Sequence, residues 1–341
     1  MSRSVRLWLA MVCLSAVALI VAACGGGGGG SDSGGGGGEE VSGKVALEGS
    51  STVLPISQVA VETFKSENSG FNATVGGKGT GDGFEAFCSG NTDISDASRP
   101  IEQEEIDACE EGGVEYIELP IGLDGIAVTV NTENDWVTDI TSDELNSMWA
   151  PESEGKVSSW SDVNSSWPSN ELALYGPGTE SGTFDFFTEV INGEEGASRS
   201  DYQASEDDNI LVQGISGDQN GVGYFGFAYY EQNQENLKLL KVDGVEPSTE
   251  SISSGEYVLS RPLFIYVNKK KLEDNQVLQP FVDYYLENVK DFVEQAQYVN
   301  LPDSTLAETR TQLEDGTTGT IYNDKGELPG GDIESALKQS K

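Results

Sequence analysis

Three short segments rich in glycine, serine and threonine contain the residues best suited to bind a ligand. They are 49–55 (GSSTVLP), 77–83 (GKGTGDG) and 176–183 (GPGTESGT). Each lies where a strand pattern gives way to a helix pattern, and a helix N-terminus offers free N–H groups and a partial positive charge. Glycine lets the backbone approach a ligand closely, and hydroxyls add donors without net charge. Three such turns in one chain predict a tetrahedral oxyanion held between lobes.

The segments around these turns alternate between strand and helix patterns. The strand-like segments are 45–48, 71–75, 114–119, 125–131, 171–175 and 263–267. The helical segments are 55–65, a helix that begins by Phe84, one that opens at Ser181, and 276–313 with a break at Pro302. This alternation predicts an α/β protein with a mainly parallel sheet covered by helices. We expect Trp136, Trp149, Trp160 and Trp167 to pack in the core rather than to stack on a sugar.

The chain is strongly acidic. It has 19 basic and 58 acidic residues among 341, which gives a net charge of −39. Such a charge repels nucleic acid and acidic membranes, so we expect neither as a partner. It suits either a saline medium or solubility alone. The sequence has no histidine, which removes the commonest general base and metal ligand, and we expect no metal and no cofactor.

The N-terminus has the pattern of a lipoprotein signal. Arg3 and Arg6 precede an apolar run that ends in small residues, so we predict a signal peptide over 1–23. Cys24 follows at once and is the predicted site of diacylglycerol attachment, and 24–42 is a Gly/Ser-rich flexible tether. The alternative is an uncleaved membrane anchor, because the apolar run approaches the length of a span.

The sequence has four cysteines, and the signal prediction assigns two of them. Cys13 leaves with the signal peptide and Cys24 receives the lipid, so Cys88 and Cys109 remain as a pair. In an exported protein this pair predicts a disulfide, which contributes about 3 kcal/mol in the chain-entropy model. Two buried free thiols are the alternative.

With these residues in view, the chain resembles the phosphate-binding proteins of the PstS family. The motifs are GSSTVLPI (49–56), DASRPI (96–101) and YGPGTESGTF (175–184), supported by NILVQ (209–213), GYFG (223–226) and SRPLF (260–264). The similarity covers residues 43–315. It implies a two-lobed fold of the periplasmic-binding-protein type (type II, Venus flytrap) with two hinge crossings. It also implies a monomer that captures inorganic phosphate and delivers it to the membrane permease subunits of an ABC importer. Such a protein lies at the outer face of the cytoplasmic membrane or in the periplasm, and touches the membrane through its lipid anchor only.

The resemblance also implies a division of the chain. We expect the crossings near 127–131 and 263–267. Lobe 1 would comprise 43–127 plus 265–330, lobe 2 would comprise 128–264, and 331–341 would form a C-terminal tail.

The family's binding turns can be carried onto this sequence residue by residue. Val53 and Leu54 align with the first turn, where threonine usually stands at Val53, so Ser51 or Thr52 must supply the hydroxyl. Thr80 matches the serine of the second turn. The closest correspondence is in the third turn, which contains Ser181, Gly182 and Thr183.

Two departures from the family pattern concern charged groups. Pro177 stands where better-known members have an arginine, and Ser98 stands where they have an aspartate. Arg99, next to Ser98, is therefore the candidate for the guanidinium, with a surface salt bridge as its alternative role. The acid that accepts the proton of hydrogen phosphate would be Glu180, Asp124 or Asp96. Its uncertain position leaves another oxyanion such as sulfate as the alternative ligand.

A binding protein without catalysis fits these features best. A secreted hydrolase that uses paired carboxylates is the rival class. With 58 acidic residues, pairs of carboxylates arise by chance, so their presence decides nothing. We therefore expect no enzyme activity.

Overall fold

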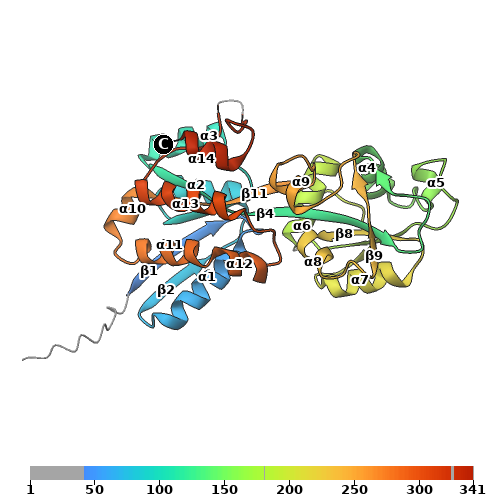
Figure 1. Ribbon diagram of the computed structural model, residues 1–341, viewed down its shortest axis with the longest axis horizontal. Coiled ribbons are helices and arrows are strands. Elements are labelled where there is room, and N and C mark those ends of the chain that lie inside the picture. The colour runs from blue at the N-terminus through green and yellow to red at the C-terminus, as the bar shows by residue number, and fades with distance from the viewer. Residues whose placement is uncertain (1–41, 180, 324–325, 341) are drawn as a thin grey trace, which may run out of the picture. The chain divides into compact units, whose positions relative to one another are not determined.

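The computed structural model describes residues 42–179, 181–323 and 326–340 (Figure 1). The predicted signal peptide, Cys24 and nearly all of the predicted tether lie outside this range. None of the helices in the described part of the chain is long and apolar enough to cross a membrane.

Strands and helices alternate along most of the chain. The strands are Gly43–Gly49 (β1), Phe71–Val75 (β2), Ile94–Ala97 (β3), Tyr116–Asn131 (β4), Asp139–Ile140 (β5), Ala173–Gly176 (β6), Gln203–Ala204 (β7), Gly221–Gly226 (β8), Leu237–Leu239 (β9), Lys241–Val242 (β10) and Ser260–Asn268 (β11). The helices are Leu54–Glu67 (α1), Thr80–Cys88 (α2), Gln103–Gly112 (α3), Ser142–Trp149 (α4), Pro151–Ser153 (η1), Trp160–Val163 (α5), Gly182–Phe187 (α6), Thr188–Asn192 (η2, a π-helix), Asp208–Gly217 (α7), Phe227–Glu231 (α8), Thr249–Ser253 (α9), Lys269–Asp274 (α10), Leu278–Glu287 (α11), Val289–Gln295 (α12), Asp303–Asp315 (α13) and Ile333–Gln339 (α14).

The main sheet is mixed rather than mainly parallel. Its strand order is β2-β1-β3-β11-β4-β8-β6-β7, with β9 also paired to β4. Pairs near the two ends, such as β1–β2, β1–β3 and β6–β8, are parallel. The central pairs that involve β4 and β11 are antiparallel, because these two long strands run in opposite directions through the middle. The α/β class is confirmed. The predicted parallel pairing is observed for β1 with β2 and β3 and for β6 with β7 and β8, but not for the pairs formed by β4 and β11.

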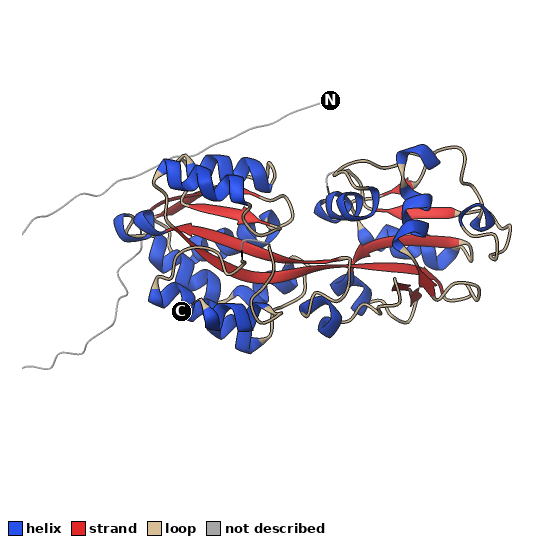
Figure 2. Cartoon of the chain, turned by 90° about the horizontal axis from the view of Figure 1, so that it is seen from above, coloured by secondary structure: helices blue, strands red, loops and turns tan. Residues whose placement is uncertain are grey.

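Strands β4 and β11 join the two lobes (Figure 2). The predicted segments 114–119 and 125–131 form the single strand β4, which is buried along its whole length. Up to Gly125 it pairs with β11, and from Ile126 onward it pairs with β8. Within β11, Phe264 to Val267 pair with β3 in the first lobe. The change of partners on β4 thus falls at 125–126, and β11 begins opposite that point, where Ser260 pairs with Gly125; both positions are a few residues before the predicted crossings. We propose that lobe 1 comprises 43–127 plus 265–330 and that lobe 2 comprises 128–264.

Apolar residues at helical spacing attach the helices to the sheet. In α1, Ile56, Ala60 and Phe64 are buried, as the sequence pattern predicts. Trp149 and Trp160 are almost fully buried in the core, and Trp136 and Trp167 pack against it, which confirms the expected core role of this cluster. A disulfide joins Cys88 at the end of α2 to Cys109 in α3.

Candidate functional site

A polar cavity of about 240 Å³ lies where the two lobes meet. Its lining residues are Ser50, Ser51, Thr52, Lys78, Gly79, Thr80, Gly81, Asp82, Ser98 and Arg99 from the first lobe, and Asp185, Glu189, Glu195 and Arg261 from the second lobe and β11. Of the predicted ligand-binding residues, Ser51, Thr52, Thr80, Ser98 and Arg99 are brought together here. The cavity combines five hydroxyl-bearing residues with both signs of charge, which suits a small anion that also carries a proton.

The first turn is held rigidly at the end of β1. Its Ser50 N–H donates to the Asp96 carbonyl (2.9 Å), and the Ser50 hydroxyl accepts from the amide of Thr52 (3.2 Å). The amide of Val53 points to the same hydroxyl (3.4 Å), and the Val53 side chain is buried in the core. Val53 and Leu54, which were predicted to bind the ligand, do not line the cavity. The hydroxyls of Ser51 and Thr52 face the cavity instead.

The second turn meets the end of β3. Gly79 has a φ of +118°, a conformation that favours glycine, and its N–H donates to the Gly49 carbonyl (2.9 Å). Thr80 then opens α2, and its hydroxyl lies 3.2 Å from the Ser98 hydroxyl and accepts from the Ser98 amide. Thr80 and Ser98 therefore form one hydroxyl pair on the cavity wall.

The third turn packs directly against the first. A Cβ atom at Gly182 would lie 2.4 Å from the Thr52 hydroxyl oxygen and 2.9 Å from its Cα, so only glycine fits there. Ser181 caps α6 by accepting from the Thr183 amide (3.2 Å). Ser181, Gly182 and Thr183 thus sit beside the cavity without lining it. The predicted convergence of three turns is observed, although the third contributes its packing rather than its side chains.

Arg261, which the sequence patterns did not single out, places its guanidinium between the first and third turns. From β11 it donates to the Thr52 hydroxyl (2.8 Å) and to the Gly182 carbonyl (3.1 Å), so it touches the first and third turns at once. Its Nε lies 3.2 Å from a carboxylate oxygen of the fully buried Asp124. The guanidinium also stacks over the Phe186 ring at 4.1 Å, and only 13% of the side chain is exposed. This is the fixed, partly desolvated cation that an anion site needs.

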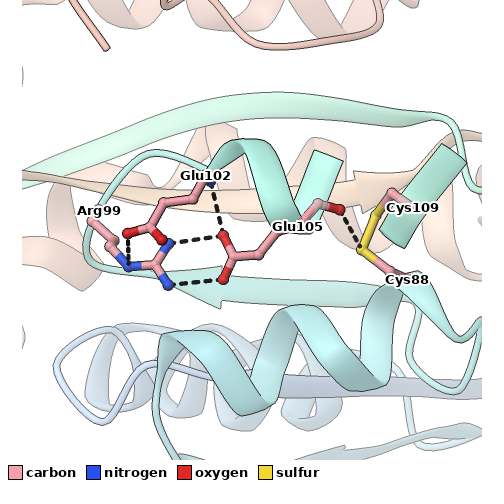
Figure 3. The surroundings of a disulfide bond; sticks show 5 residues. All are labelled: Cys88, Arg99, Glu102, Glu105 and Cys109. Carbon is pink, nitrogen blue, oxygen red and sulfur yellow. Dashed lines mark hydrogen bonds and ion pairs between the residues drawn. A yellow bond between two sulfur atoms is a disulfide. The ribbon is translucent and has the colours of Figure 1, made fainter. Parts of the chain in front are cut away.

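Arg99 also lines the cavity, but its donors are engaged by acids (Figure 3). Both terminal nitrogens bond the two oxygens of Glu105 at 2.8 Å, and Nε lies 3.3 Å from Glu102. Glu105 also completes the capping box that starts α3. The Glu105 hydrogen bonds raise the pKa of Arg99. Arg99 thus forms the ion pair that was its alternative role, at the edge of the site.

A carboxylate that the sequence argument did not name faces the cavity. Asp185, in the first turns of α6, accepts from the Ser51 hydroxyl (3.3 Å) across the lobes. Burial raises its pKa to about 6, and the negative charge of Glu195 adds to that rise. Ser51 and Arg261 act in the opposite direction. Asp185 is therefore ionised at neutral pH and takes up a proton when the pH falls to about 6.

Two of the three acids predicted as proton acceptors do not line the cavity. Asp96 and Asp124 are fully buried and do not line the cavity, and Asp124 is the ion-pair partner of Arg261. Glu180 is outside the described residues.

A signal in the sequence could have found Arg261. The tripeptide Ser-Arg-Pro occurs twice, at 98–100 and at 260–262, and both copies belong to motifs of the family resemblance. Strands β3 and β11 are neighbours in the sheet, so the two arginines approach one cavity from adjacent strands. Asp185 had no comparable signal, because an acid in the first turn of a helix is common.

These features define the class of protein. Two α/β lobes joined by two long strands, with a polar cavity that both lobes line, are the architecture of an extracytoplasmic solute-binding protein. The profile of the PBP superfamily domain matches residues 35–289.

Known proteins narrow this class to a family. Protein SphX of Synechocystis sp. is 44% identical over 83% of this chain and 86% of its own length. Phosphate-binding protein PstS of Staphylococcus saprophyticus is 42% identical over 80% of this chain and 85% of its own. The crystal structure of a possible phosphate binding protein from Planctomyces limnophilus has 42% identity and a TM-score of 0.77, and covers 81% of this chain and 99% of that one. The chain belongs to the PstS family of the PBP superfamily.

Proposed function

We propose that this protein captures inorganic phosphate in the interlobe cavity and delivers it to the membrane permease of an ABC importer, without catalysing a reaction. The observation that carries the proposal is the convergence of hydroxyls, a fixed guanidinium and a carboxylate on one cavity of about 240 Å³. Family membership supports the same reading, since the PstS relatives are named for phosphate binding.

Each group has a distinct proposed role. Ser51, Thr52, Thr80 and Ser98 donate hydroxyl hydrogen bonds to phosphate oxygens. Arg261 supplies the positive charge and replaces the arginine that is missing at position 177. Asp124 already pairs with Arg261 at 3.2 Å, so part of the positive charge is balanced before the ligand binds, which suits a carrier that must release it.

Asp185 is the proposed acceptor of the ligand's proton. Hydrogen phosphate has an O–H group that can donate to an ionised carboxylate, whereas sulfate has none and meets only repulsion. Asp185 lines the cavity and is ionised for the most part at neutral pH, since its pKa is about 6. Asp96 and Asp124 are buried behind the turns, and so Asp185 has the better access.

Calorimetry on the domain without its signal peptide tests the proposal. We expect phosphate to bind with a dissociation constant in the micromolar range or tighter, which corresponds to about −8 kcal/mol or more. Arsenate has the same shape and protonation and should bind as well, while sulfate should bind far more weakly. Sulfate binding as tight as phosphate binding would refute the phosphate assignment and leave a general oxyanion carrier.

We also propose that a lipid on Cys24 holds the protein at the outer face of the membrane. The support is the apolar run before Cys24 and the Gly/Ser tract after it. Replacement of Cys24 by serine removes the thioether that would carry the lipid, so the Cys24→Ser protein should appear in the aqueous phase of a detergent partition. Retention in the membrane fraction would point to an uncleaved anchor at 7–23. Cys13→Ser is the control, and should leave the partition unchanged.

A further inference from the structure

A buried carboxyl lies directly beneath the first turn and has no part in the proposed ligand contacts. Asp96 lies in β3 in register with Gly49, and none of its surface is exposed. Its backbone carbonyl accepts the Ser50 N–H at 2.9 Å. A Cβ atom at Gly49 would lie only 2.0 Å from that carbonyl oxygen, so the turn and Asp96 form one rigid unit.

The side chain of Asp96 is set among neutral groups. Its Oδ1 accepts the Ser57 hydroxyl of α1 (2.9 Å), whose oxygen lies 3.1 Å from the hydroxyl of Tyr285 in α11. Ser57 and Tyr285 are fully buried too. Oδ2 has no hydrogen-bond partner among the described residues. Ile265 of β11 pairs with Asp96 along the strand and brings no charge.

The charged group that acts on this carboxyl is negative. It is Glu48 of β1, which itself pairs with the exposed Lys78 (3.4 Å). An ionised carboxylate that is removed from water without a cation is costly, so the site favours the neutral acid. Burial raises the pKa of Asp96 to about 7, the Ser57 hydrogen bond opposes the rise, and Glu48 adds to it. Asp96 is therefore poised between its two charge states near neutral pH.

We propose that Asp96 takes up a proton when an anion binds to the turn above it, so that anion capture and protonation of this buried carboxyl are linked. The negative ligand lies over the turn that Asp96 supports, and like charges at close range favour the neutral acid. By reciprocity, protonated Asp96 strengthens anion binding and ionised Asp96 weakens it. This inference rests on the proposed anion site. It adds one step to binding and release: Asp96 takes up a proton when the anion binds and loses it when the anion leaves.

Proton counting by calorimetry tests the link. Phosphate is titrated into wild type and Asp96→Asn at pH 7 in buffers with different ionisation enthalpies, which measures the protons bound per phosphate. Proton exchange by phosphate itself and by Asp185 occurs in both proteins, so the difference between them isolates Asp96. We expect wild type to take up more protons than Asp96→Asn at pH 7 and the same number at pH 5, where Asp96 is already protonated. For a rise of about one unit in the Asp96 pKa on binding, the dissociation constant of wild type relative to Asp96→Asn should increase about fivefold between pH 6 and pH 8, and should approach about tenfold at pH values well above 8.

Glu62→Gln is the matched control. It removes an exposed carboxylate from α1, the helix that carries Ser57, and Glu62 does not line the cavity. Its proton count should equal that of wild type. Equal counts in wild type and Asp96→Asn with phosphate binding intact would overturn the inference alone, whereas failure of wild type to bind phosphate would overturn the proposed function with it.

A second measurement does not depend on the folding of a variant. Carbon-13 NMR of the aspartate side-chain carboxyls follows the titration of Asp96 in wild type, with and without saturating phosphate. We expect the midpoint to move to higher pH when phosphate is present. A midpoint that stays in place would overturn the link.

Discussion

Replacement of Arg261 by alanine is expected to raise the dissociation constant for phosphate at least about 100-fold, the scale of one or two charge-assisted hydrogen bonds. Arg261 is a partly buried cation of the cavity, and it donates hydrogen bonds to both Thr52 and Gly182. Its removal also leaves Asp124 without a partner, and an uncompensated buried charge costs about 3–5 kcal/mol of unfolding free energy. Calorimetry and denaturant unfolding measure the two effects separately.

Two further variants separate binding from folding. The double variant Arg261→Gln/Asp124→Asn removes both charges of the pair, so it should regain most of the lost stability while phosphate binding stays weak. Arg99→Ala is the matched comparison, because Arg99 lines the same cavity. Its donors are engaged by Glu105 and Glu102, so we expect a loss of less than about tenfold. A larger loss in Arg99→Ala than in Arg261→Ala would return the ligand's guanidinium to Arg99.

Asp185→Asn is expected to change the ratio of phosphate to sulfate affinity by about 100-fold or more in favour of sulfate. The carboxylate that accepts the phosphate proton is lost, and an amide N–H that can donate to sulfate takes its place. The pH dependence gives a second readout. The pKa of Asp185 is raised to about 6, so the group is ionised above that value and protonated below it. Sulfate binding to wild type should therefore strengthen as pH falls from 7 to 5, and Asp185→Asn should lack the component with a midpoint near 6.

Glu195→Gln is the control for Asp185. It removes a negative charge that raises the pKa of Asp185 but keeps the acceptor itself. Selectivity for phosphate should persist, and the midpoint of the sulfate profile should move to lower pH. If Asp185→Asn kept the selectivity of wild type, the acceptor would have to be another acid, such as Glu180, which is outside the described residues.

Local sequence patterns predicted part of the secondary structure, including β1, β2, β11, α1 and α13, but they did not predict β3, β8, α3, α4 or α7. The spacing of apolar residues identified α1 and β2, and the glycine and hydroxyl segments identified the first two turns that border the cavity. These signals succeed because helix periodicity and turn chemistry depend on neighbours in the chain. The same local view divided β4 into two strands, since Pro120 and Gly122 interrupt its pattern. Pairing with β11 on one side keeps this stretch extended, with a register shift between Leu263 and Phe264.

By itself the sequence determined the α/β class, the family, the anionic character of the ligand and the pairing of Cys88 with Cys109 as the candidate disulfide. Only the tertiary structure decided which charged groups line the cavity. Arg99 and Arg261 occur in two copies of the same tripeptide, yet Arg99 is paired with Glu105, whereas Arg261 donates to Thr52 and to Gly182. Asp96, Asp124 and Asp185 are the same type of residue, but their surroundings differ. Asp96 is fully buried, Asp124 is the buried ion-pair partner of Arg261, and Asp185 lines the cavity. The reason is physical: hydrogen-bond partners and access to water are set by segments distant in the chain, which only the pairing of β3, β11 and β4 brings together.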